Sequence, residues 1–278
     1  MGNAERSLRR VGTRKYPLLL PIFMVLNLLH LPVVDSTNTY LRSLVNAPEW
    51  TCVTADSQTA GRGRQQRVWY SAPGEGLYLS VLLRPTDRLA DTPLLSLVAG
   101  IAVAETLIGL GLDTIDIKWP NDILVDGKKI SGILVETSGL TGAGSTGLQS
   151  PRVIVGIGVN LNQRTFPADL EGRATSLLGE LGSETRPDAV RDRLLDRLSE
   201  WYRHWREGAV EMILNRWLDL STYGFDREVA VSLDTGLVRG VTAGLTAGGA
   251  LRLRTADGTI STIVAGDVTS LRPITPEK

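Results

Sequence analysis

The stretch IDIKWPNDILVDGKKISGILVET, residues 115–137, contains the strongest strand signals of the chain. Three apolar runs follow one another in it, at Ile115–Trp119, Ile123–Val125 and Lys129–Thr137, and Asp126-Gly127 separates the last two. An Asp-Gly pair between apolar runs is typical of a tight β-hairpin. We therefore predict three consecutive strands that belong to one sheet.

The flanking segments alternate strands with helices and extend this sheet. Four further apolar runs predict strands, at Leu28–Val34, Thr51–Ala55, Gly76–Leu83 and Val153–Asn160. Three segments predict helices, namely one from a cap at Ser36 or Thr37 to about Val45, one over Asp91–Leu110, and a pair within Pro187–Leu220 that breaks near Gly208. The helix at Asp91–Leu110 is apolar nearly all round, so we expect it to lie under the sheet.

The composition changes at Gly224. Beyond it, short segments of period two are separated by Thr235-Gly236, Gly248-Gly249 and Asp257-Gly258. This pattern predicts a small all-β barrel of about five strands that ends near Leu271. The expected organisation is an N-terminal extension (1–30), a larger α+β domain (31–222) and the small barrel (224–272), with a flexible surface loop at Ser138–Pro151.

Charge and cysteine content narrow the function classes. The 278 residues hold 30 Lys and Arg against 30 Asp and Glu, a balance that disfavours nucleic-acid binding. One cysteine and two histidines are too few for an internal disulfide or a Cys/His zinc site, so we expect a reducing, cytoplasmic environment. A basic stretch precedes the apolar run Pro17–Val34, an order like that of an anchor, but three prolines, Asn27 and His30 in this run argue against a membrane span. A mis-assigned start or an anchor remains the alternative for residues 1–30.

The segment QTAGRGRQQRVW, residues 58–69, has the composition of an anion-binding loop. Glycines let the backbone approach a ligand, and the guanidinium groups of Arg62, Arg64 and Arg67 suit carboxylate or phosphate. The alternative is a solvated basic turn. The segment lacks the endings of a P-loop and of a dinucleotide fingerprint.

Two more segments carry unusual residues at predicted strands. Lys118 ends an apolar strand beside Asn121 and Asp122, and a buried lysine there would need an anion. Glycines alternate in Gly156-Ile-Gly-Val-Asn160, so a ligand or another backbone must approach that face closely. Gly132 indicates the same on the neighbouring strand.

Six ordered motifs, DSTN (35–38), QTAGRGR (58–64), GLYLSVLLRP (76–85), KWPNDI (118–123), GKKISGILVE (127–136) and VGIGVNLN (155–162), together resemble biotin protein ligases. The resemblance covers about residues 35–272. It implies an α+β fold, in which a mixed sheet with helices like that of class II aminoacyl-tRNA synthetases precedes an SH3-like barrel.

The resemblance also implies roles for individual residues. Biotin would be bound by Ser36, Thr37, Asn38, Gln58, Gly61, Arg62, Gly63, Arg64, Lys118 and Gly132. ATP and the adenylate would be bound by Arg64, Arg67, Trp69, Lys118, Asn121, Gly156, Gly158 and Asn160. Lys118 and Arg64 would be the catalytic residues, and Mg²⁺ would arrive with ATP rather than occupy a fixed protein site.

The implied reaction joins biotin to ATP as biotinyl-5′-AMP and then transfers it to a lysine of a biotin carboxyl carrier domain. The expected enzyme is a monomer or homodimer. The sequence departs from the family in two places. Gln65-Gln66 stands where Arg-Gly is common, which puts the closure of the loop in question. About 34 residues precede the first motif, which we expect to be too few for a DNA-binding domain. The alternatives are a lipoate or octanoate transferase of the same fold and a non-catalytic biotin-binding protein.

Overall fold

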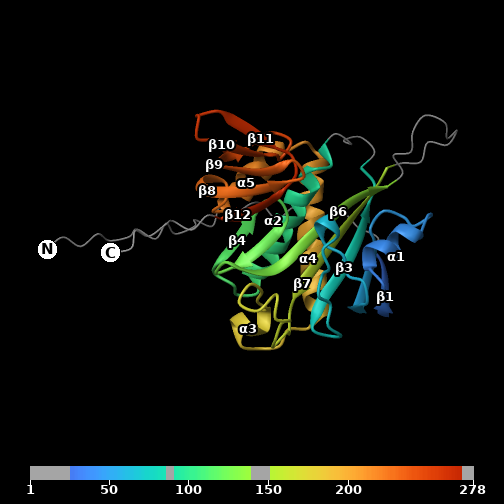
Figure 1. The fold of residues 1–278 in the computed structure, drawn as a ribbon. Helices are drawn as coiled ribbons and strands as arrows, with labels where there is room; N and C mark the ends of the chain where they lie inside the picture. The colour runs from blue at the N-terminus through green and yellow to red at the C-terminus, as the bar shows by residue number, and fades with distance from the viewer. Residues whose placement is uncertain (1–25, 86–90, 139–150, 271–278) are drawn as a thin grey trace.

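The computed structural model describes residues 26–85, 91–138 and 151–270, which form two sheets with helices (Figure 1). The larger sheet has the strand order β1-β2-β3-β7-β6-β5-β4. Its strands are β1 (Asn27–Val34), β2 (Thr51–Gln58), β3 (Gly76–Leu83), β4 (Ile115–Lys118), β5 (Asp122–Val125), β6 (Lys128–Ser138) and β7 (Arg152–Asn160). The pairing of β1 with β2 is parallel and the other pairings are antiparallel, so the predicted mixed sheet is confirmed.

The predicted hairpin joins β5 to β6. Asp126 and Gly127 both have positive φ, 47° and 78°, as a tight turn between twisted strands requires. The pairing of β6 with β7 then brings Gly132 opposite Gly158. Two positions without side chains therefore lie side by side in the middle of the sheet.

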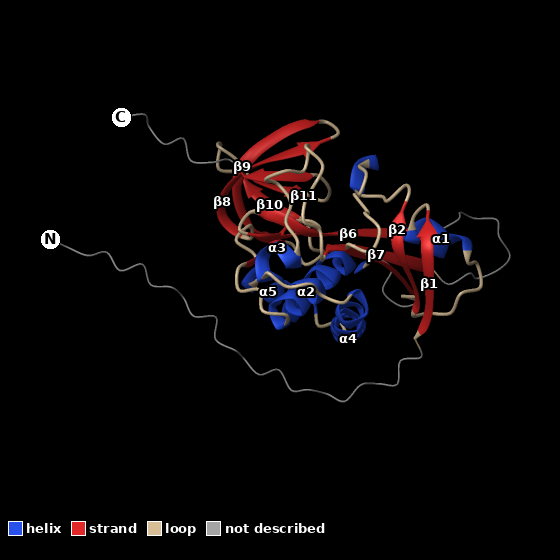
Figure 2. Cartoon of the chain, turned by 90° about the horizontal axis from the view of Figure 1, so that it is seen from below, coloured by secondary structure: helices blue, strands red, loops and turns tan. Residues whose placement is uncertain are grey.

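One face of the sheet is covered by α2 (Leu94–Gly109), α4 (Pro187–Arg206) and α5 (Val210–Asp219), which lie together on one side of β6 and β7 in Figure 2. Helix α2 packs between strands β4 to β7 and helix α4, which explains why it is apolar nearly all round. Its predicted place under the sheet is confirmed. The helix begins at Leu94 with Pro93 as its N-cap residue, three residues after the predicted start at Asp91.

The opposite face carries α1 (Thr37–Ser43). Leu41 of this helix packs in a small apolar cluster with Val53, Leu82 and Ile154 from three strands. The buried guanidinium of Arg152 donates from Nη2 to the carbonyl oxygens of Leu41, at 3.1 Å, and of Leu44, at 2.9 Å. These bonds satisfy carbonyl groups in the last turn of the helix and at its C-cap, and they hold the C-terminal end of α1 against β7.

The C-terminal sheet is antiparallel, in the order β11-β10-β9-β8-β12. Its strands are β8 (Phe225–Leu233), β9 (Gly236–Leu245), β10 (Leu251–Arg254), β11 (Ile260–Ile263) and β12 (Asp267–Ser270), which confirms the prediction of about five strands after Gly224. The indole nitrogen of Trp119 donates to the carbonyl oxygen of Gly249 at 3.0 Å, so the two sheets are joined by a buried hydrogen bond.

Some elements differ from the sequence prediction. The helix after Ser36 ends at Ser43 rather than Val45, and a second short helix, α3 (Leu177–Leu181), was not predicted. The anion-binding loop contains a 3₁₀ turn, η1 (Arg64–Gln66). The predictions for residues before 26, for the loop at 139–150 and for Leu271 lie outside the described residues. In the described part of the chain, no helix combines the length and the apolar character that crossing a bilayer needs.

Candidate active site

A cavity of about 850 Å³ lies on the α1 face of the large sheet. Fifteen of the sixteen residues assigned from the sequence line it, namely Ser36, Thr37, Asn38, Gln58, Arg62, Gly63, Arg64, Arg67, Trp69, Lys118, Asn121, Gly132, Gly156, Gly158 and Asn160. The exception is Gly61, which lies beside the cavity where a Cβ would be 2.5 Å from the carbonyl oxygen of Trp69. The structure thus brings together residues that are more than 120 positions apart in the sequence.

A chain of hydrogen bonds connects the polar residues at the α1 end of the cavity. Gln58 Oε1 accepts from the backbone N–H of Thr37 at 2.9 Å and from its hydroxyl at 3.2 Å. The hydroxyl of Ser80 lies 2.7 Å from Thr37 Oγ1 and 2.5 Å from Asn38 Oδ1. Gln58 Nε2 donates to Ser71 Oγ at 3.0 Å. Ser71 and the fully buried Ser80 therefore belong to the hydrogen-bond network of the site, although neither was predicted from the sequence.

Glu136 on β6 closes this chain at its other end. Asn38 Nδ2 donates to Glu136 Oε2 at 2.9 Å, while Nη2 atoms of Arg42 and Arg62 both lie 2.8 Å from Glu136 Oε1. Burial alone would raise the pKa of the Glu136 carboxyl, but these donors and their positive charges outweigh it, and the pKa is lowered. The signal in the sequence was an acidic residue at the end of the apolar run SGILV.

Trp69 covers the glycine face of the sheet. A Cβ at Gly158 would lie 2.4 Å from Trp69 Cε2, and one at Gly132 would lie 2.9 Å from Trp69 Cζ3. Asn38 covers Gly156 in the same way, with Oδ1 at 2.2 Å from an added Cβ. In this chain, side chains of the protein make the close approach that was expected of a ligand or another backbone. The indole N–H of Trp69 is buried without a hydrogen-bond partner.

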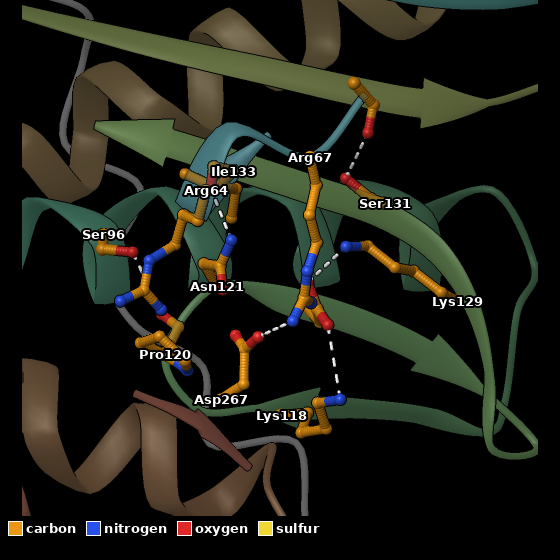
Figure 3. A network of polar contacts seen from close by, with 12 residues as sticks. Arg64, Arg67, Ser96, Lys118, Pro120, Asn121, Lys129, Ser131, Ile133 and Asp267 are labelled. Carbon is orange, nitrogen blue, oxygen red and sulfur yellow. Dashed lines mark hydrogen bonds and ion pairs between the residues drawn. The ribbon is translucent and has the colours of Figure 1, made fainter. Parts of the chain in front are cut away.

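Lysines form the β4–β6 side of the cavity (Figure 3). Lys118 Nζ lies 3.4 Å from Asp122 Oδ2, and Lys129 Nζ lies 2.5 Å from Asp122 Oδ1. Lys129 also stands over the ring of Trp69, 5.4 Å from its centroid, within the range of a cation–π contact. Lys129 was not predicted as a site residue, although the motif GKK contains it.

Two of the three arginines of the loop, Arg64 and Arg67, contact the C-terminal sheet and the residue that precedes it. Arg67 forms an ion pair with Asp267, and Arg64 Nη1 donates to the carbonyl oxygen of Gly266 at 3.2 Å (Figure 3). Burial lowers the pKa of Arg64, yet a guanidinium stays protonated at neutral pH. The loop therefore presents permanent positive charge at the place where the two sheets meet.

Two asparagines of the site hold backbone groups. Asn121 Nδ2 donates to the carbonyl oxygen of Ile133 at 2.7 Å, and Asn160 Nδ2 donates to that of Thr175 at 2.9 Å. Both asparagines therefore stabilise the backbone of neighbouring segments and also line the cavity.

The Gln65-Gln66 pair departs from the family motif and adopts a conformation that favours glycine. Gln65 has φ 52° and Gln66 has φ 61°, both in the left-handed region. Both glutamines therefore carry the conformational cost of a left-handed backbone, which a glycine would not.

No group of three or more His, Cys, Asp or Glu side chains among the residues that the structure describes is arranged to hold an ion.

Comparison with known proteins matches this chain to a class of ligases. Residues 30–160 match the biotin/lipoate A/B protein ligase family, and residues 224–269 match the biotin protein ligase C-terminal domain. The Bacillus spizizenii protein named bifunctional ligase/repressor BirA is 37% identical over 247 residues, which cover 87% of this chain and 73% of that protein. The biotin–[acetyl-CoA-carboxylase] ligase of Mycobacterium tuberculosis is 34% identical over 229 residues, 78% of each chain.

A solved structure agrees with these sequence matches. The biotin protein ligase from Aquifex aeolicus in complex with biotin and ATP has a TM-score of 0.75 at 34% identity, covering 88% of this chain and 99% of that one. The chain belongs to the biotin protein ligase family.

Proposed function

We propose that the protein is a biotin–[acetyl-CoA-carboxylase] ligase, which activates biotin with ATP and transfers it to a lysine of a biotin carboxyl carrier protein. The observation that carries the proposal is the combination of two surfaces in one cavity. Neutral hydrogen-bonding groups from Ser36 to Asn38 and Gln58 lie at one end, and the cations Lys118, Lys129, Arg64 and Arg67 lie around the other. A ligand with an uncharged polar head and an anionic tail matches this division. Biotin has both, in its ureido ring and its carboxylate.

In the first half-reaction, an oxygen of the biotin carboxylate attacks the α-phosphorus of ATP. The bond from that phosphorus to the bridging oxygen breaks, and pyrophosphate leaves with Mg²⁺. Lys118 offsets the repulsion between carboxylate and phosphate, and Arg64 stabilises the charge on the phosphate. One well-placed charge of this kind supplies about 3 kcal/mol, by analogy with one oxyanion-hole donor.

In the second half-reaction, the amine of the carrier lysine attacks the acyl carbon of biotinyl-5′-AMP. The bond to the phosphate oxygen breaks, AMP leaves, and the amine loses a proton as the amide forms. The loop with Arg64, Arg67 and Trp69 lies over the cavity and excludes water from the mixed anhydride until the carrier arrives. Trp69 must move for a ligand to reach the glycine face that it covers.

Three finer points belong to this proposal. Mg²⁺ would arrive bound to ATP rather than at a fixed protein site, and it would supply positive charge to the leaving pyrophosphate. The single buried cysteine, Cys52, favours a reducing compartment, and we place the reaction in the cytoplasm. The balanced net charge favours a protein partner rather than nucleic acid.

The test is incorporation of labelled biotin into a purified carrier domain in the presence of ATP and Mg²⁺, with labelled octanoate in a parallel reaction. We expect biotin transfer that depends on ATP, with formation of AMP and pyrophosphate. Transfer of octanoate and not of biotin would assign the chain to the lipoate branch of the family. Biotin binding without transfer would instead indicate a non-catalytic binding protein.

A further inference from the structure

Glu136 is the acidic residue at the end of the hydrogen-bond chain described above. It lies behind the cavity rather than on its surface, since the residues that line the cavity include its neighbours Leu134 and Asn38 but not Glu136 itself. Three elements converge on its carboxylate, because Asn38 and Arg42 come from α1, Arg62 comes from the loop, and Glu136 ends the apolar part of β6. Its side chain is 16% exposed, so water competes weakly for these bonds.

Two acceptors fix which way the amide of Asn38 points, namely the carboxylate of Glu136 at 2.9 Å and, at the longer distance of 3.4 Å, the carbonyl oxygen of Leu134. An ionised carboxylate accepts hydrogen bonds and cannot donate, so the amide must turn its NH₂ group toward Glu136. The oxygen of Asn38 then faces Ser80, whose single hydroxyl proton is donated to it. Thr37 must in turn donate its own hydroxyl proton to Ser80 or Gln58. The charge of Glu136 thereby sets the direction of the hydrogen bonds along the whole chain.

The same carboxylate separates two positive charges. The guanidinium groups of Arg42 and Arg62 both contact Glu136 Oε1, so two positive charges lie close together on either side of one oxygen atom. Without the negative charge, the repulsion between the two guanidinium groups would be unopposed, and neither side chain would be held in its present place by an ion pair with residue 136. Arg62 begins the anion-binding loop, and its displacement would change the end of the cavity that also holds Thr37 and Asn38.

We propose that Glu136 is a positioning residue for biotin binding, which orients the amide of Asn38 and holds Arg62 against α1. It acts through these two residues and does not itself touch substrate. The inference rests on the proposed function, because it names the ligand end of the cavity as the biotin end. The inference goes further than the proposed function, because it assigns the orientation of the biotin-binding side chains to Glu136, which does not line the cavity.

The test compares Glu136→Gln with two other variants in the carrier biotinylation assay. Glutamine keeps the shape but removes the charge, and it can present an N–H where Asn38 needs an acceptor. We expect KM for biotin to rise about tenfold, equivalent to about 1.4 kcal/mol, with KM for ATP changed less than twofold. Glu136→Asp keeps the charge on a shorter side chain and should recover part of the biotin affinity.

The matched control is Arg42→Met, which removes a partner of the same carboxylate but no residue that lines the cavity. It should leave KM for biotin within twofold of the parent. Thermal unfolding of each variant separates positioning from stability. Arg42→Met removes one ion pair and Glu136→Gln removes two, so both should lower the midpoint, and only Glu136→Gln should raise KM for biotin.

Two results would overturn the role of Glu136. One is a folded Glu136→Gln variant with the parent KM for biotin, and the other is an equal rise in KM for biotin and ATP. Direct titration with biotin, without ATP or carrier, measures the affinity for biotin alone. It therefore tests the role of Glu136 separately from the proposed ligase activity. A parent chain that binds biotin but transfers none would contradict the ligase activity, while the affinities of parent and variant would still decide the role of Glu136. A parent chain that binds no biotin would overturn both.

Discussion

A methyl group added at Gly158 should displace Trp69 from the sheet. The Cβ of Gly158→Ala would lie 2.4 Å from Trp69 Cε2 and 2.5 Å from its Nε1. Carbon atoms in contact are about 3.5–4.0 Å apart, so the ring must move by about 1 Å or more. Gly158 is paired on both sides, with Tyr78 of β3 and Gly132 of β6, so the backbone of β7 has little freedom to give way.

The expected cost follows from this geometry. Forcing one additional methyl into a packed site typically costs about 1–3 kcal/mol, and displacing the ring also weakens its cation–π contact with Lys129. We expect Gly158→Ala to lower the free energy of unfolding by about 2 kcal/mol, which corresponds to roughly 5 °C in Tm for a domain of this size. Urea and thermal unfolding of the purified protein would measure it.

A double-mutant cycle with Trp69→Ala identifies the cause. Once the indole is removed, the space it filled can take the methyl group, so Gly158→Ala should then cost less than about 0.5 kcal/mol. Gly109→Ala serves as the control, because no heavy atom lies within 4 Å of the added Cβ at the end of α2. Equal costs of Gly158→Ala with and without Trp69 would refute the reasoning and place the strain in the sheet backbone.

Three further predictions concern the loop, the lysine and the carboxylate. Gln66→Gly removes a side chain from a position with φ 61°, so it should stabilise the protein by about 1 kcal/mol in urea unfolding; a destabilised variant would contradict this. Lys118→Ala should abolish formation of biotinyl-5′-AMP, measured by pyrophosphate release, with an unchanged unfolding curve; adenylate formation at the parent rate would remove Lys118 from the mechanism. Because the pKa of Glu136 is lowered by folding, its ionised form stabilises the native state at neutral pH, and this contribution is lost as the pH falls below the ordinary pKa of glutamate. The stability of the parent should therefore fall more steeply than that of Glu136→Gln between about pH 6 and pH 3 in urea unfolding, and parallel curves would contradict the assignment.

Much of the fold could be predicted because its signals are local. The Asp126-Gly127 turn has the positive φ values that its residue types favour, and Gly76–Leu83 forms a strand with the predicted bounds. The helix over Leu94–Gly109 was recognised from its apolar character. The short α3 was missed because five residues provide too little periodicity to distinguish a helix from a loop.

The site residues that belong to a sequence motif could be predicted. Those that join the site through contacts with residues far away in the sequence could not. Ser80 lies in an apolar strand as an isolated hydroxyl, and nothing in the sequence distinguishes it from a surface serine. Glu136 gains its importance from partners 74 and 98 residues away. The glycine face of β7 correctly indicated a close approach, but which group approaches it depends on how the loop folds back, and Trp69 is 89 positions earlier in the chain. Such pairings are fixed by the tertiary fold and leave no local pattern.

The hydrogen bond from Trp119 to Gly249 has a consequence for cooperativity. The indole is buried in a hydrophobic core that includes Leu94 and Leu97 of the larger unit and Val229 and Leu251 of the smaller one. Melting the C-terminal sheet on its own would expose part of this shared core and leave a buried indole N–H without an acceptor. The amide protons of both sheets should therefore exchange with solvent through a common opening, and calorimetry should record one unfolding transition for the two units.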